Sequence, residues 1–189
     1  MIIQGDSFQV LQQFEDKYFD YCLTSPWFKE EDVGEPYWPW FDRFISLIRQ
    51  KVRKVAFIFQ SSTNKKQMYL RYNEDILREL IWGKEPSCYS YRYESIFVFL
   101  LDKSFKVNKY IFKDFWRMPA ILSNSETYQN PPKLYREIVM LLPPGRIVDP
   151  FAGTGTLGLA CRDLKHEVTL IDLKPIKFPN YQLEVYMNG

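Results

Sequence analysis

Hydrophobic residues recur along the chain at two different spacings, which predict strands and helices in alternation. Short continuous apolar runs are typical of buried strands, and they lie at 18–24, 55–59, 95–101, 147–149 and 168–172. Apolar residues three and four positions apart predict amphipathic helices, and they lie at 7–14, 40–48, 76–81, 134–142 and 154–164. Ser7 is expected to cap the first of these helices.

This alternation indicates the fold class. Strands that alternate with helices favour an α/β fold, with a mostly parallel sheet and helices on both faces. Residues 1–189 are expected to form a single domain, because this length suits one domain with a core of its own. The stretch 102–132 follows neither spacing, so we expect a long irregular insert with little structure of its own.

Composition narrows the class of protein. Apolar residues make up 46% of the chain and aromatic residues 17%, which argues for a folded protein and against disorder. The net charge of +2 is compatible with a nucleic-acid partner without requiring one. The 3 cysteines form no CxxC pair, which argues against a disulfide framework or a cysteine zinc site. His166 is the single histidine, so histidine-based catalysis would have one candidate base.

The N-terminal sequence MIIQGDSFQV has no basic segment leading into an apolar run. A signal peptide is therefore not expected, and no apolar stretch is long enough to cross a membrane. We expect a cytoplasmic protein that has no membrane partner.

A glycine-rich segment, Asp149–Gly155, follows a predicted strand and opens a predicted helix. Glycines let a ligand approach the backbone, and ligands in doubly wound sheets bind at the carboxyl ends of strands. Asp172 ends the next strand, where its carboxylate could accept hydrogen bonds from ribose hydroxyls. One interpretation is a dinucleotide site, because Gly153, Gly155 and Gly158 match GxGxxG. A plain tight turn is the second. S-adenosylmethionine, which has no phosphates, is the third and is favoured, since the loop lies close to the C-terminus.

A second segment with candidate chemistry lies just after the strand at 18–24. The hydroxyl of Ser25 and the carbonyl of Pro26 can accept hydrogen bonds from an exocyclic amine and so localise its lone pair. The rings of Trp27 and Phe28 could stack on a base turned out of a duplex. Taken alone, this short segment is better explained as a strand-end turn followed by two core aromatics.

The two segments together resemble the DNA amino-methyltransferases, which modify adenine or cytosine at the exocyclic amine. The order matches their permuted subgroup, in which the catalytic segment precedes the cofactor loop. The likeness covers nearly the whole chain. It rests on six segments in the family's order, namely Gly5–Ser7, Thr24–Phe28, Arg92–Phe99, Phe115–Pro119, Asn130–Lys133 and Asp149–Gly155.

The resemblance implies a Rossmann-like S-adenosylmethionine-dependent methyltransferase fold and direct methyl transfer without a metal. It implies that Ser25, Pro26, Trp27 and Phe28 are catalytic. The residues that it implies for the cofactor are Asp6, which would lie near the adenine, and Asp149, Pro150, Phe151, Ala152, Gly153, Thr154, Gly155, Asp172 and Lys133. The implied partner is double-stranded DNA with its target base flipped out, and restriction-modification is one possible setting.

The chain departs from the family in three places. Trp27 stands where the family has a second proline, and Asp172 stands where glutamate is usual. The region that would carry a target-recognition module is short, so we expect weak specificity or help from a second subunit in a homodimer. Its basic residues could follow a phosphate backbone or form a solvated loop, and they are Lys103, Lys106, Lys109 and Lys113.

The target base and the activity are less determined than the cofactor. Within this family, a serine at the position of Ser25 favours N(4) of cytosine over N(6) of adenine. RNA or a protein amide are further substrates to consider. The alternatives to an active enzyme are a degenerate methyltransferase that binds cofactor or nucleic acid without turnover, and a dinucleotide-dependent oxidoreductase.

Overall fold

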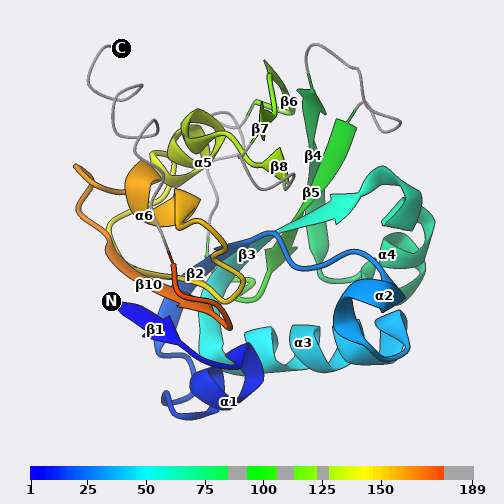
Figure 1. The fold of residues 1–189 in the computed structure, drawn as a ribbon, viewed down its shortest axis with the longest axis horizontal. Coiled ribbons are helices and arrows are strands. Elements are labelled where there is room, and N and C mark those ends of the chain that lie inside the picture. Colours follow the sequence, from blue (N-terminus) through cyan, green and yellow to red (C-terminus); the bar gives the residue numbers. More distant parts are fainter. Residues whose placement is uncertain (85–92, 106–112, 123–127, 177–189) are drawn as a thin grey trace.

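An eight-stranded sheet runs through the protein in the order β1-β10-β9-β2-β3-β5-β4-β6 (Figure 1). The computed structural model describes residues 1–84, 93–105, 113–122 and 128–176. The strands of this sheet are β1 (Ile2–Gln4), β2 (Phe19–Thr24), β3 (Val52–Ser61), β4 (Ile76–Lys84), β5 (Tyr93–Leu100), β6 (Phe115–Met118), β9 (Arg146–Asp149) and β10 (Glu167–Asp172). Among them, β5 alone runs antiparallel to its neighbours. The predicted α/β fold with a mostly parallel sheet is therefore confirmed.

Helices cover both faces of the sheet. The helices are α1 (Ser7–Gln12), α2 (Glu30–Val33), α3 (Tyr37–Lys51), α4 (Lys65–Tyr72), α5 (Pro132–Val139), α6 (Thr156–Ala160) and the 3-10 helix η1 (Ser62–Asn64). One hydrophobic cluster joins α5 and α6 to the sheet face that carries Leu23 and Phe57. A second cluster joins α1, α3 and α4 to the opposite face, which carries Cys22 and Ile58. Because alternate side chains of a strand point to opposite sides, an apolar strand gives both faces of the sheet a surface against which helices pack.

One predicted helix is wrong. Residues 76–81 belong to β4, which pairs with β5 on one side and β6 on the other. Ile76 and Leu80 have helical spacing, but a register shift between Ile76 and Arg78 places them against opposite faces of the sheet. The helix nearby is α4, which begins at Lys65 and ends at Tyr72.

Two helix ends differ from the sequence prediction. Asp6, and not Ser7, caps α1, because its side chain accepts a hydrogen bond from the backbone N–H of Gln9. Ser7 is instead the first helical residue, and its hydroxyl donates to the carbonyl of Pro150. The helix predicted at 154–164 is shorter, since α6 starts after Gly155, whose φ of 80° is left-handed.

The segment 102–132 was expected to be irregular, but part of it is regular. The strand β6 lies within it and extends the sheet beside β4. A separate two-stranded pair, β7 (Ile121–Leu122) with β8 (Tyr128–Gln129), also lies there. The backbone groups of β6 find their hydrogen-bond partners in β4. The composition of the segment does not reveal this pairing. Cys88, Lys106 and Lys109 lie outside the described residues.

Candidate functional site

The parallel strands β2, β9 and β10 end at the same edge of the sheet, and the candidate residues gather there. Thr24 ends β2, Asp149 ends β9 and Asp172 ends β10. The Thr24 hydroxyl donates to Asp149 Oδ1 over 2.7 Å, so the two segments singled out from the sequence are in direct contact. This bond joins residues 125 positions apart in the chain.

The glycine loop between β9 and α6 is shaped by two left-handed residues. Gly153 has φ of 52° and Gly155 has φ of 80°. A side chain is strained at such φ values. A Cβ built on Gly153 would meet no atom within 4 Å, so the space above this residue is open to a ligand. The Gly153 N–H donates to Asp172 Oδ2 over 2.8 Å, which ties the loop to the end of β10.

Asp172 is held by backbone groups on both oxygens. Besides the bond from Gly153, its Oδ1 accepts from the backbone N–H of Lys174 over 2.9 Å. A carboxylate has about four acceptor positions, so each oxygen can still accept from a ligand hydroxyl. The side chain is half-buried and therefore accessible. The geometry suits a ribose, and that role stays a prediction.

Asp149 lies beneath this loop and is only 2% exposed. Burial raises the pKa of its carboxyl from 3.8 to about 7, while the hydrogen bonds from Thr24 and from the Phe151 N–H act in the opposite direction. The charge of Asp172 raises the pKa further. A positively charged ligand group would favour the ionised form, so this end of the loop is suited to the ammonium of an amino acid.

This burial gives a pH-dependent prediction for Asp149→Asn. Between about pH 4 and pH 7 the unfolded chain has lost a proton that folded Asp149 keeps, so rising pH lowers the free energy of unfolding. The variant lacks this dependence. Its free energy of unfolding relative to wild type should therefore increase from pH 5 to pH 8 in urea denaturation. Asp163→Asn, at an exposed position, is the control. Parallel pH curves for wild type and Asp149→Asn would contradict the assignment.

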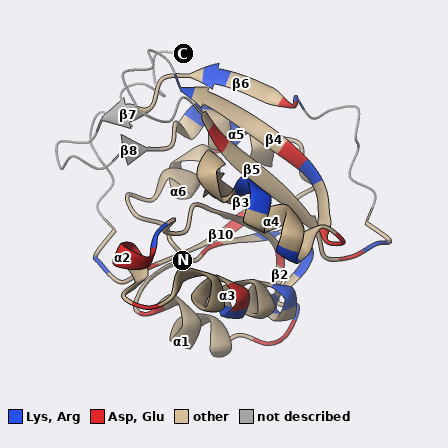
Figure 2. Ribbon diagram, turned by 90° about the vertical axis from the view of Figure 1, so that its right-hand side faces the viewer, with Lys and Arg blue, Asp and Glu red and all other residues tan. Residues whose placement is uncertain are grey.

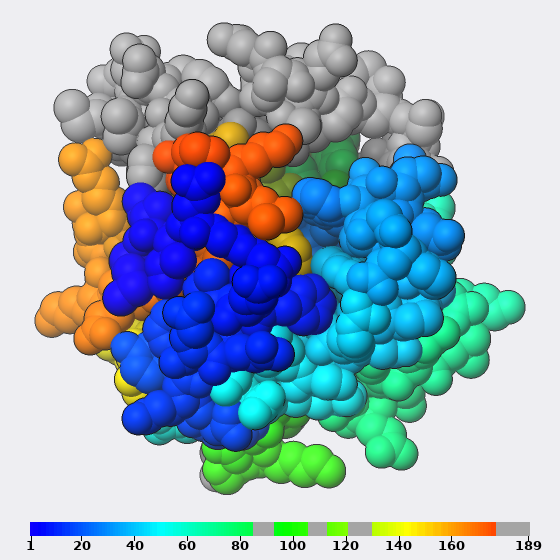
Figure 3. All heavy atoms as spheres, turned by 60° about the horizontal axis from the view of Figure 1, so that its bottom comes forward, coloured from blue at the N-terminus to red at the C-terminus, as the bar shows by residue number. Residues whose placement is uncertain are grey.

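The N-terminal segment is fastened to the same loop. The Gly5 N–H donates to the Asp172 carbonyl over 2.9 Å, and the Ser7 hydroxyl bonds to Pro150. The Phe151 ring packs against Phe44, with ring centroids 5.2 Å apart. In Figure 3 the chain around residue 150, coloured yellow, is set back between the dark-blue N-terminal segment and the orange-red end of β10. Asp6 follows Gly5 and caps α1.

The segment after β2 has one buried, one exposed and two half-buried residues. Pro26 is buried, and Ser25 and Phe28 are half-buried. Trp27 is 45% exposed and is therefore accessible from solvent. Phe28 packs against the cluster under α5 and α6. The geometry brings Ser25 and Pro26 to the edge of the sheet where the cofactor loop lies.

Three residues that sequence reasoning missed hold this segment in place. Asn64 Nδ2 donates to the Phe28 carbonyl over 3.1 Å and to Gln60 Oε1 over 2.9 Å. Gln60 Nε2 in turn donates to the Tyr37 hydroxyl over 2.7 Å. The chain of bonds thus runs from the end of β3 and η1 to the candidate catalytic segment. A polar pair at the end of a strand, Gln60 followed by Asn64, was the available sequence signal.

Lys133 and Thr154 are two further candidates for the cofactor site. Lys133 is exposed near the start of α5, and none of the described hydrogen bonds or ion pairs links it to the glycine loop. Asp20, near the start of β2, pairs with Lys54 Nζ at 3.1 Å and accepts from the Arg146 N–H, which places it in a structural contact at the other end of the strand. Thr154 contacts Thr156, with 3.5 Å between the hydroxyl oxygens.

The described residues hold no group of three or more His, Cys, Asp or Glu side chains arranged for a metal ion. Within the same residues, no helix is long and apolar enough to cross a bilayer. Cys22 and Cys161 are free thiols in the core, where burial raises the pKa of both.

Several solved structures share this fold. The PvuII cytosine-N4-specific DNA methyltransferase superposes with a TM-score of 0.74 at 16% identity, covering 92% of this chain and 82% of its own. A putative DNA modification methylase from Thermus thermophilus, in complex with S-adenosyl-L-methionine, gives 0.72 at 18% identity, with 92% and 88% covered. The M1.HpyAVI–SAM complex gives 0.71 at 19% identity, with 100% and 99% covered. Among curated proteins, none matches the chain significantly in sequence.

A family model described as DNA methylase matches residues 27–178, which is most of the chain. This match includes the glycine loop, Asp172 and the segment that starts at Trp27. Together with the sheet order and the gathering of Thr24, Asp149 and Asp172 at one edge, it establishes the class of the protein. The chain belongs to the DNA methylase family of S-adenosylmethionine-dependent amino-methyltransferases.

Proposed function

We propose that this chain transfers the methyl group of S-adenosylmethionine to the exocyclic amine of a base in double-stranded DNA, with N(4) of cytosine favoured over N(6) of adenine. The observation that carries the proposal is the Thr24–Asp149 hydrogen bond, which holds the end of the candidate catalytic segment against the glycine loop. Proximity of donor and acceptor sites is the main requirement for a direct displacement.

The residues present fit the cofactor. Open space above Gly153 admits its amino acid end, and the buried carboxyl of Asp149 beneath the loop is an acceptor for its ammonium. Asp172 has acceptor capacity left for two ribose hydroxyls, and we assign Asp6, which follows Gly5, to the adenine. The bound cofactor supplies an activated methyl group on a sulfonium.

The role assigned to the catalytic segment is to orient the amine. The Ser25 hydroxyl oxygen and the Pro26 carbonyl oxygen accept from the amino hydrogens, which localises the nitrogen lone pair toward the methyl carbon. The aromatic face of Phe28, with Trp27 beside it, stacks on the flipped base. The exposure of Trp27 supports this role, since an exposed ring is available to a base. Cytosine is the favoured target base because, in the family that this chain resembles, a serine at the position of Ser25 favours N(4) of cytosine.

Charge restricts the side from which DNA approaches. The helix α2 follows the catalytic segment and carries Glu30, Glu31 and Asp32, all exposed (Figure 2). Repulsion from these carboxylates disfavours a phosphate backbone over α2. The cations exposed on β6 and at the start of α5, Arg117 and Lys133, favour approach from that side.

The direct test is product analysis. Purified protein is incubated with unmethylated plasmid DNA and isotopically labelled S-adenosylmethionine, and the DNA is digested to nucleosides for mass spectrometry. Labelled N(4)-methyldeoxycytidine is the expected product. Labelled N(6)-methyldeoxyadenosine would support amine methylation and correct the base. If neither product forms on any DNA tested, the proposal is contradicted.

Asn64→Ala is expected to lower kcat by about tenfold and leave the affinity for S-adenosylmethionine unchanged. Loss of the Asn64–Phe28 bond loosens the segment that aligns the amine, and small misplacements cost large factors in rate. The measurement is steady-state methyl transfer beside calorimetric titration of the cofactor. Asn73→Ala, at the exposed end of α4, is the matched control. Equal loss of cofactor binding would show that Asn64 supports the fold and not the segment.

A further inference from the structure

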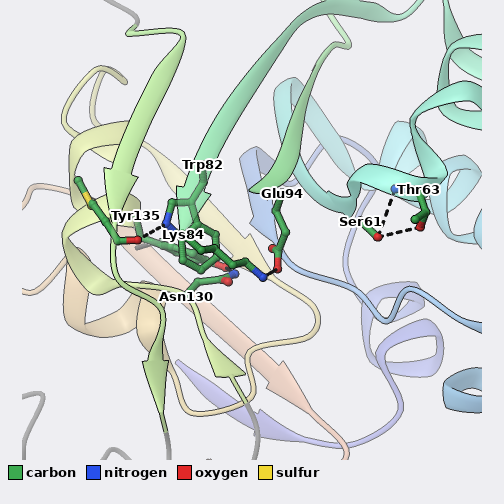
Figure 4. Close-up of polar contacts among 8 residues, drawn as sticks. Ser61, Thr63, Trp82, Lys84, Glu94, Asn130 and Tyr135 are labelled. Carbon is green, nitrogen blue, oxygen red and sulfur yellow. Dashed lines mark hydrogen bonds and ion pairs between the residues drawn. The ribbon is translucent and has the colours of Figure 1, made fainter. Parts of the chain in front are cut away.

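A buried ion pair joins the ends of β4 and β5. Lys84 Nζ bonds to Glu94 Oε1, and each side chain is 10% exposed. The other carboxylate oxygen, Glu94 Oε2, is buried and has no hydrogen-bond partner within the described part of the chain. Figure 4 shows the two side chains pointing toward each other, with Trp82, Asn130 and Tyr135 beside them.

The unpartnered oxygen is costly and needs an explanation. Removing an ion pair from water carries a large desolvation cost, which is offset only when the remaining lone pairs are satisfied. Glu79 on β4 shows that this fold can satisfy a buried carboxylate. Its side chain is 9% exposed, and it accepts from Ser95, Tyr69 and Lys65. Within the described residues Glu94 has Lys84 alone, so its free oxygen points to a ligand.

The pair lies at the edge of the sheet that carries the candidate site. Glu94 is opposite Ser61 on β3, past the level at which β2 ends, and Lys84 is opposite Met118 on β6. By strand alternation Glu94 shares the sheet face of Ile96 and Val98, which is the face under α5 and α6.

Tyr135 connects this pair to the cofactor loop. Burial raises the pKa of its hydroxyl, and the charges of Asp149 and Glu94 both raise it further. Tyr135 therefore lies within electrostatic reach of both carboxylates. Its ring stacks on Phe59 with centroids 5.2 Å apart, and its hydroxyl accepts from Asn130 over 3.0 Å. Glu94 and Asp149 thus both lie near the Tyr135 hydroxyl.

Building on the proposed function, we infer that Lys84 and Glu94 read the Watson–Crick edge of the flipped target base. Flipped bases are read by hydrogen bonds to this edge. Cytosine and adenine both present an amine next to an unprotonated ring nitrogen. Lys84, which can only donate, bonds to that ring nitrogen, and Glu94 Oε2 accepts from the adjacent amino hydrogen.

The same pair rejects bases that have no amine to methylate at this position. Thymine and guanine present a carbonyl oxygen next to a ring N–H, which is the reverse order of acceptor and donor. Their carbonyl oxygen would face the carboxylate of Glu94, and their ring N–H would face the ammonium of Lys84. Lys84 and Glu94 are therefore specificity-determining residues. Glu94 shares the amino hydrogen beside the ring nitrogen with one of the two acceptors Ser25 and Pro26, and the second amino hydrogen is left to the other.

Trp82 provides a readout that requires no turnover. Its indole N–H donates to the Met118 carbonyl over 3.0 Å, and Lys84 Nζ lies 5.1 Å from its ring centroid. Protein labelled with ¹⁵N and saturated with S-adenosylhomocysteine is titrated with deoxycytidine, deoxyadenosine or thymidine, following the Trp82 indole resonance. Deoxycytidine or deoxyadenosine should give a saturable shift, with thymidine at least tenfold weaker. Glu94→Gln and Lys84→Met should each weaken the shift-inducing nucleoside at least tenfold, and Glu79→Gln should not.

Methyl transfer to unmethylated plasmid DNA is measured on the same proteins. Nucleoside binding by wild type without methyl transfer would sink the proposed function and keep the base-reading pair. Methyl transfer by Glu94→Gln and Lys84→Met at the wild-type kcat/KM would sink the base-reading pair and keep the function. A wild-type protein in which thymidine binds as well as deoxycytidine, or in which none of the nucleosides shifts Trp82, would also overturn the inference.

Discussion

Asp172→Ala should weaken the binding of S-adenosylmethionine by about a hundredfold or more. Hydrogen bonds to a charged group contribute roughly 1.5–3 kcal/mol each, and two ribose hydroxyls would lose their acceptor. The variant also removes the acceptor of the Gly153 N–H, so the glycine loop loses its tie to β10. Calorimetric titration of the purified proteins measures the change, with NAD as the second ligand.

The control for this experiment is Asp163→Ala, which removes an exposed carboxylate from the turn after α6. Its affinity for S-adenosylmethionine should equal that of wild type. A wild-type affinity for Asp172→Ala would show that the acid at the end of β10 does not hold the ribose. Binding of NAD in place of S-adenosylmethionine would favour the oxidoreductase interpretation of the GxGxxG pattern.

The sequence predicts the cofactor half of the site well, because its determinants are local. Gly153 and Gly155 follow a short apolar run, and Asp172 ends the next one, so strand, loop and acid can be assigned from a stretch of about two dozen residues. The structure brings these residues together as expected, and their roles toward a ligand stay predictions. The Thr24–Asp149 bond is different, since neither residue indicates the other across 125 positions.

The other half of the site depends on contacts that no local pattern reveals. Asn64 reaches the Phe28 carbonyl from 36 positions away. Lys84 and Glu94 meet only because β4 is a strand paired with β5. The helix predicted at 76–81 left this pairing unpredicted, because a short apolar stretch can fit the spacing of a helix or of a strand. Because this one element was assigned wrongly, the buried ion pair at this edge of the sheet could not be predicted.

Ser25→Ala is expected to lower kcat for DNA by roughly a hundredfold, because a preorganised hydrogen-bonding group at the reacting centre contributes about that factor. The affinity for S-adenosylmethionine should stay unchanged, since the glycine loop and Asp172 are left intact. Ser25→Thr keeps a hydroxyl at the same position and should recover part of the rate. Ser46→Ala, on the exposed side of α3, is the control for loss of a serine.

The result for Ser25 also separates an active enzyme from a degenerate binder. Unchanged kcat in Ser25→Ala would show that the amine is oriented by other groups. If wild type binds S-adenosylmethionine without turnover, Trp27→Pro restores the second proline of the family and becomes the decisive variant. Turnover that appears only in Trp27→Pro would mean that the natural chain is a degenerate methyltransferase. Because Ser25 and Pro26 keep the two acceptors for the amine, we expect turnover in wild type as well.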